Sequence, residues 1–229
     1  MKKLLMLLLI LFLIAWKWPT HENIISSIHN QLDLETQGEL NLTLMKEGAI
    51  APDKDFKDTV NHHYPPSYKL AQNWLNKARY YYSTQNYEQA SYAFGVASHY
   101  IDDSFVAPHN INGESSQDHS DFEEQPQNYF PKTKCYNVEL NLEQELITAT
   151  KNKKDWSIWL NNRDPNIPEN EIEQAMPLLF HLAITTFDAS CIEPTKVNFE
   201  KKIYSYKIII WTAGIFSIII YLILNLLKN

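Results

Sequence analysis

Histidine and acidic side chains recur at short, regular spacings along this 229-residue chain. His99 and Asp103 lie four residues apart, and so do His119 and Glu123. On a helix this spacing brings the two side chains of a pair to the same face. Imidazole nitrogen and carboxylate oxygen both bind zinc at about 2.0–2.2 Å, so each pair can hold part of one ion.

Three further His-bearing motifs add potential donors to these two pairs. An isolated His-x-x-x-Asp pair is also common on solvent-exposed helix faces, so the ordered set carries more information than any one pair. The full set exceeds what a single ion needs, and it indicates a cluster of two or three ions. The additional candidates are His21, Asp53, the adjacent His62 and His63, and His109.

The composition favours a packed domain and excludes several classes of protein. Hydrophobic residues make up 45% of the chain and aromatic residues 13%, which is typical of a globule with a core. The net charge of −7 argues against binding to double-stranded DNA, because proteins that bind it usually carry an excess of basic residues. Two cysteines, Cys135 and Cys191, exclude a disulfide-dense scaffold, although they could pair in an oxidising compartment.

The elements that must position the donors are predicted to be helical. Apolar residues repeat at spacings of three and four, and Pro or Asn precedes several of these stretches. The sequence therefore predicts an all-α fold, a compact helical domain in which long loops carry part of the metal-binding set. We expect helices from Pro19 with Thr20 as the cap, over 66–83, from Asn86 to about 103 and over 169–189, and His-bearing loops over 48–64 and 104–134.

The two ends of the chain are predicted to be targeting and membrane segments. Residues 1–15 contain two lysines and then an apolar run from Leu4 to Ala15, which is typical of a signal peptide. Cleavage after Ala15 is expected, with a retained anchor as the alternative. Residues 208–227 are uncharged and long enough for a transmembrane helix. This leaves an ectodomain over 16–203 and predicts a single-pass protein of the cell membrane with this domain outside the cytoplasm.

The donor motifs, taken in order, resemble a known family. Phe94 to Asp103 reads FGVASHYIDD, and His109 follows, and then the His119/Glu123 pair. Together with the 48–64 segment and with Trp16 five residues before His21, this pattern resembles the zinc-dependent phospholipases C. These enzymes are related in fold to the single-strand-specific zinc nucleases. The resemblance covers about half of the chain, from Trp16 to about Glu123.

The resemblance implies about three zinc ions and a set of nine ligands. Asp103 would be shared between the first two ions, and the amine of Trp16 would be a ligand only after cleavage of the signal peptide. His62 is preferred to His63, which stays open as an alternative. The first ion would be held by Asp53, His62, His99 and Asp103, the second by Asp103, His21 and the amine and carbonyl of Trp16, and the third by His109, His119 and Glu123.

The expected activity is hydrolysis of a phosphodiester. A zinc-bound hydroxide would attack phosphorus in line, and Asp53 is the candidate catalytic base. Glu22 and Asp55 are expected beside the ligands. The first hypothesis is a membrane-anchored phospholipase C-like enzyme whose partners are a phospholipid substrate and the bilayer that holds its C-terminal anchor. The alternatives are a single-strand-specific nuclease of the same fold and a non-catalytic, membrane-anchored metal-binding surface protein.

Overall fold

The computed structural model describes residues 18–132, 134–135 and 139–192, and in this part of the chain all regular secondary structure is helical. An isolated β-bridge between Leu32 and Cys191 is the exception. The all-α prediction is thus confirmed. The helices are α2 Pro19–His29, α3 Leu34–Glu39, α4 Leu42–Ala51, η1 Pro52–Phe56, α5 Pro66–Ser83, α6 Tyr87–Asp102, η2 Asp103–Phe105, η3 Ala107–Asn110, α7 Ser116–Glu124, α8 Leu142–Ala149, η4 Thr150–Asn152, α9 Lys153–Asn162 and α10 Asn166–Phe187.

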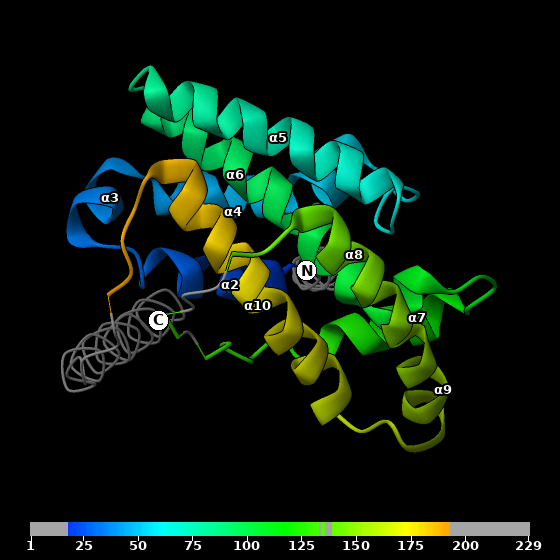
Figure 1. The fold of residues 1–229 in the computed structure, drawn as a ribbon. Helices are drawn as coiled ribbons and strands as arrows, with labels where there is room; N and C mark the ends of the chain where they lie inside the picture. The colour runs from blue at the N-terminus through cyan, green and yellow to red at the C-terminus, as the bar shows by residue number, and fades with distance from the viewer. Residues whose placement is uncertain (1–17, 133, 136–138, 193–229) are drawn as a thin grey trace, which may run out of the picture. The chain divides into compact units, whose positions relative to one another are not determined.

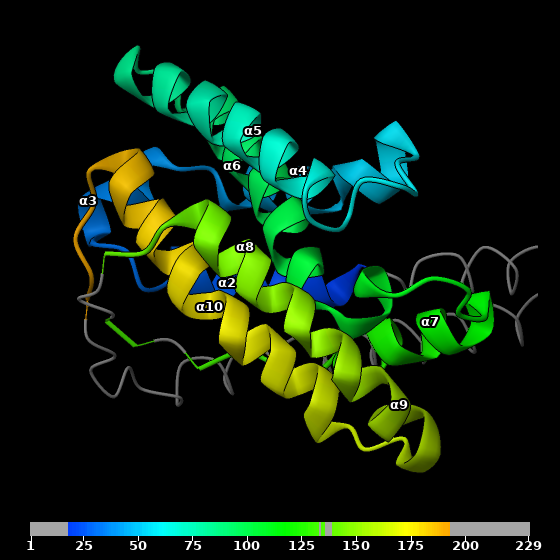
Figure 2. The same cartoon turned by 45° about the vertical axis from the view of Figure 1, so that its right-hand side comes forward.

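Helix α6 is the central element of the fold. It packs against α5 along one side and against α4 along another, and α2 packs on α4 (Figure 1). The yellow helix α10 packs on α6, α5 and α2 (Figure 2). Helix α6 has a fully buried apolar stripe, which includes Ala90, Ala93, Phe94 and Ala97. Burial of this stripe fixes the rotation of α6 about its axis and therefore the direction in which its last turn points.

Two glycines allow α4 and α6 to approach each other closely. A Cβ atom on Gly95 would overlap the carbonyl oxygen of Met45 and lie 2.8 Å from the backbone nitrogen of Ala49. A Cβ atom on Gly48 would likewise overlap the carbonyl oxygen of Tyr92. Only glycine leaves the space that this backbone contact needs.

The predicted helices are found close to their expected bounds. Helix α5 covers 66–83 as predicted, and Asn86 is the residue before α6. Helix α10 begins three residues earlier than expected, at Asn166. The cap assigned to Thr20 is wrong, because α2 begins at Pro19 and Trp18 is its N-terminal cap. Proline suits the first position of a helix, where its missing N–H is not needed.

The two predicted loops are more ordered than the sequence indicated. The first part of the 48–64 segment completes α4, and Pro52–Phe56 forms one π-helical turn. The 104–134 segment contains η2, η3 and the helix α7. Helix α7 lacks an apolar stripe, since Phe122 is its one buried residue, and Ser115 caps it by accepting a hydrogen bond from the backbone of Asp118. Periodicity alone therefore could not reveal it.

A disulfide joins the segment before α8 to the residues after α10. Cys135 and Cys191 are bonded, with 5.7 Å between their Cα atoms, so the pairing that the sequence left open is present. Among the described residues, no helix has both the length and the apolar character needed to cross a bilayer. The predicted signal over 1–15, Trp16 and the predicted span over 208–227 lie outside the described residues.

Candidate metal centre

The last turn of α6 and the start of η2 bring His99 and Asp103 together in the interior. Their side chains are 0% and 4% exposed, and His99 Nε2 lies 3.2 Å from Asp103 Oδ2. His99 Nδ1 donates a hydrogen bond of 2.8 Å to the carbonyl oxygen of Ala49 in α4. Since a carbonyl oxygen only accepts, this contact holds the proton on Nδ1 and leaves the lone pair of Nε2 facing Asp103.

Asp53 and His62 reach the same place from the segment between α4 and α5. Nδ1 of His62 lies 2.6 Å from Asp103 Oδ2, and its Nε2 contacts the carbonyl oxygen of Asp58 at 2.7 Å. Asp53 Oδ1, on the π-helical turn, lies 3.6 Å from His99 Nε2 and 3.7 Å from His62 Nε2. His63 belongs to none of the groups of converging donors among the described residues, so the geometry favours His62.

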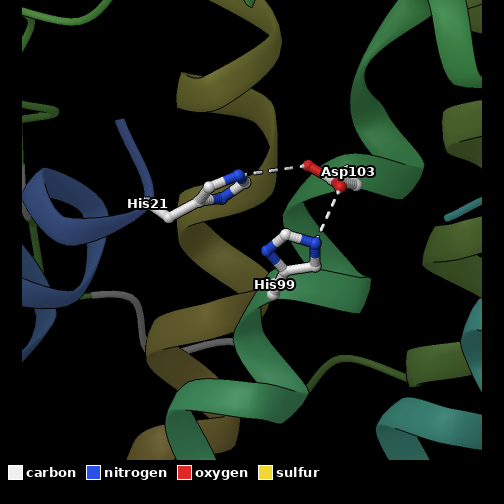
Figure 3. Close-up of side chains that lie close together, drawn as sticks. All are labelled: His21, His99 and Asp103. Atoms are coloured by element: carbon white, nitrogen blue, oxygen red, sulfur yellow. Dashed lines mark ion pairs between the residues drawn. The ribbon is translucent and has the colours of Figure 1, made fainter. Parts of the chain in front are cut away.

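His21 approaches from α2, on another side of Asp103. Figure 3 shows the imidazoles of His21 and His99 both directed at the Asp103 carboxylate, from α2 and from the end of α6. His21 Nε2 lies 3.7 Å from Asp103 Oδ1, while its Nδ1 lies 3.2 Å from Asp102 Oδ2. Asp102 therefore orients His21, a role that sequence reasoning did not assign. The signal that could have revealed Asp102 was its spacing of three residues from His99, which places both on neighbouring parts of one helix face.

A second set of donors centres on Glu123 in α7. Its Oε1 lies 2.9 Å from both His109 Nε2 and His119 Nε2. The ring of His119 is held from its other side, because Nδ1 lies 3.3 Å from Glu114 Oε1. His109 comes from η3 and also lies 3.5 Å from Asp103 Oδ2, which connects this set to the first.

Eight of the nine predicted ligands converge, and Trp16 is the one outside the described residues. Asp103 is the shared member, because imidazoles from α2, α6, η3 and the 57–65 loop surround its two oxygens. The donor atoms within each group lie within 4.8 Å of one another. The groups are His21/His99/Asp103, Asp53/His62/His99, His62/Asp103/His109 and His109/His119/Glu123.

The carboxylates and imidazoles of the cluster shift one another's pKa values strongly. Burial alone would lower the pKa of His21, yet Asp102 and Asp103 outweigh it and raise this pKa to about 10. Burial likewise lowers the pKa of His62 and of His119, but Asp103 raises the pKa of His62 to about 9 and Glu123 raises that of His119 to about 9. Burial also works against ionisation of Asp103, but the surrounding imidazoles hold its pKa well below the usual range.

These residues fit zinc by their chemistry. Neutral imidazole and ionised carboxylate are ligands that zinc commonly takes, and zinc can replace the protons that the metal-free cluster holds. The partners of the ring nitrogens complete the fit, since Asp58, Asp102, Glu114 and Ala49 each hold one nitrogen of an imidazole. Glu22 and Asp55 belong to none of the donor groups among the described residues, so their place beside the ligands stays a prediction.

The donors open onto a pocket of about 550 Å³, which is within the range of ligand sites. Apolar Val60, Pro108 and Ile111 line other parts of this pocket, as does His63. The side chain of Asp53 is 39% exposed and is therefore accessible to a bound molecule. The donors that line the pocket are Asp53, His62, His109, His119 and Glu123.

Fold and site together define an all-α protein in which histidines and carboxylates from several helices converge as metal donors. The family model described as zinc-dependent phospholipase C matches residues 20–181, and the chain belongs to this family. Membership implies hydrolysis of a phosphodiester bond with zinc. No curated protein matches this chain.

Proposed function

We propose that this chain is a membrane-anchored, phospholipase C-like enzyme that uses about three zinc ions to hydrolyse a phospholipid at its phosphodiester bond. The observation that supports it best is the convergence of eight donors, Asp103 and Glu123 among them, beside an open pocket. Such a set has little value in a protein that only packs helices, because burying charged groups without a binding partner is costly.

The proposed first ion is bound by Asp53, His62, His99 and Asp103, and the groups of converging donors support this set. The second is bound by Asp103, His21 and Trp16. The third is bound by His109, His119 and Glu123, which form a group by themselves.

Bound zinc ions would lower the pKa of a water molecule toward about 7 and neutralise charge on the phosphodiester. Asp53 stands at the pocket wall and is the residue proposed to accept the proton of the attacking water. Asp102 keeps His21 in place, and the Ala49 carbonyl does the same for His99. The burial of Asp103 strengthens every electrostatic interaction around it.

A phospholipid is preferred to single-stranded nucleic acid as the substrate. Strand binding relies on a basic groove with stacking aromatic side chains. Among the described residues that line the pocket there is no lysine or arginine and no Trp, Tyr or Phe. The apolar rim residues Val60 and Ile111 are instead compatible with a lipid surface.

We also propose that residues 1–15 are a signal peptide, that 208–227 form a transmembrane anchor, and that the domain lies outside the cytoplasm. The Cys135–Cys191 disulfide supports this location, because disulfides persist mainly in oxidising compartments. Sequencing the N-terminus of the mature protein tests it directly. A start at Trp16 is expected, and a start at Met1 would leave the second ion without the amine.

The activity is tested with the purified full chain on phospholipid vesicles and on single-stranded DNA, with and without a chelator. We expect release of a phosphorylated head group from vesicles, loss on chelation and recovery with zinc. Asp103→Asn should abolish this release. Cleavage of DNA alone would support the nuclease alternative. A zinc-loaded protein that cleaves neither substrate would instead be a metal-binding surface protein.

A further inference from the structure

A short turn separates two donors that the proposed function assigns to different ions. Asp103 begins η2 and His109 lies in η3, so the backbone between them sets how far apart their side chains lie. His109 Nε2 and Asp103 Oδ2 are 3.5 Å apart. A change in this turn would therefore alter the geometry between ion sites without touching any ligand.

Buried side chains from the C-terminal helices hold this turn. Glu171 of α10 accepts a hydrogen bond of 2.9 Å from the backbone N–H of Ala107. Asn152, the last residue of η4, donates one of 2.8 Å to the carbonyl oxygen of Phe105. Glu171 is 1% exposed, Asn152 6% and Ala107 0%, so water does not compete for these bonds. In each of the two hydrogen bonds the partners are more than 40 residues apart in sequence.

Glu171 is an unusual residue for this place in the core. Its Oε1 has no hydrogen-bond partner and its carboxylate no ion-pair partner among the described residues. Burial raises the pKa of Glu171 to about 9, with a contribution from Asp155, so the carboxyl group is neutral at physiological pH. An apolar side chain would avoid the cost of burying this carboxyl group. What the residue provides in return is the acceptor for Ala107.

We propose that Glu171 is a positioning residue of the metal centre: through the Ala107 N–H it fixes the turn that sets the separation of Asp103 and His109. The inference rests on the proposed ligand set. Helices α8 to α10 then contribute to the centre by holding its backbone, although none of the described donor groups includes a residue from them. Asn152 holds the same turn through the carbonyl oxygen of Phe105.

The test is zinc titration of the metal-free full chain against a chromophoric competitor, with unfolding followed in parallel. Glu171→Met keeps an unbranched side chain of similar length but removes the acceptor, and at least one ion should bind about 10–100-fold more weakly. Glu171→Gln keeps a neutral acceptor oxygen and should bind zinc as the unchanged protein does. Should Glu171→Met fail to fold, Asn152→Ala removes the other contact and should also weaken zinc binding.

Leu182→Ala is the matched control for stability. Leu182 is buried on α10, eleven residues beyond Glu171, and its truncation should lower the midpoint of unfolding while leaving zinc affinity unchanged. Unchanged zinc affinity in Glu171→Met, or equal weakening in Glu171→Gln or Leu182→Ala, would overturn the proposal. Phosphodiester cleavage by the unchanged protein is measured separately, and its absence would refute the proposed function and not the role of Glu171 in zinc binding.

Discussion

Substitution of Gly95 by alanine tests the link between helix packing and the metal centre. The added Cβ would overlap the Met45 carbonyl and crowd Ala49, and both neighbours are backbone atoms of α4 that cannot rotate away. Overpacking of this kind costs about 1–3 kcal/mol, and only about 0.5–1 kcal/mol returns from the better helix propensity of alanine. We expect a net loss of about 2 kcal/mol, since the clash is with backbone.

To relieve this overlap, α4 would have to move away from α6, and the movement would also alter the metal centre. The carbonyl oxygen of Ala49 would withdraw from His99 Nδ1, so His99 would lose the partner that fixes its tautomer and orientation. Gly95→Ala should therefore lower the midpoint of thermal unfolding by about 4–8 °C and weaken zinc binding. Both are measured on the same preparation, by calorimetry and by zinc titration.

Gly38→Ala is the control for this experiment. Gly38 lies in α3, and a Cβ atom there would meet nothing within 4 Å. The same chemical change should thus stabilise the protein by about 0.5–1 kcal/mol and leave zinc binding unchanged. Our account of the α4–α6 contact is refuted if Gly95→Ala is as stable as the unchanged chain and retains its zinc.

Three further predictions concern pH, metal and the disulfide. In the metal-free protein the raised pKa of His21 stabilises the fold fully below about pH 6.5, and this contribution is lost as the pH rises through about 10, so the unfolding midpoint should fall over that range. Asp102→Asn should flatten the fall, and a midpoint that rises with pH would contradict the assignment. Zinc at about 1,000 times its dissociation constant should stabilise the protein by about 4 kcal/mol per independent site, measured as the loss on chelation; an unchanged midpoint would show that the donors hold no ion. Replacing Cys135 and Cys191 by serine, which opens a 56-residue separation, should cost about 4 kcal/mol in denaturant unfolding, and a loss near zero would rule out this bond as a stabilising link.

Much of the donor set could be predicted because its spacing is local. The rise and turn of a helix put His99 and Asp103 on one face wherever that helix lies, and the same holds for His119 and Glu123. The bounds of α5 and the start of α6 followed from apolar periodicity and from the residues that precede helices. By contrast, α7 and the π-helical turn were missed, because neither presents an apolar stripe.

The sequence by itself determined the helical class, the donor types and their order along the chain. Only the tertiary structure decided which carbonyl oxygen or carboxylate contacts each imidazole. The carbonyl oxygen of Ala49 contacts His99, and the carboxylate of Asp102 contacts His21. The tertiary structure also decided that Glu171 reaches Ala107 from 64 residues away. The physical reason is that such contacts depend on how closely two helices pack and on their rotation, which are set by the burial of whole faces and by the space that Gly95 leaves.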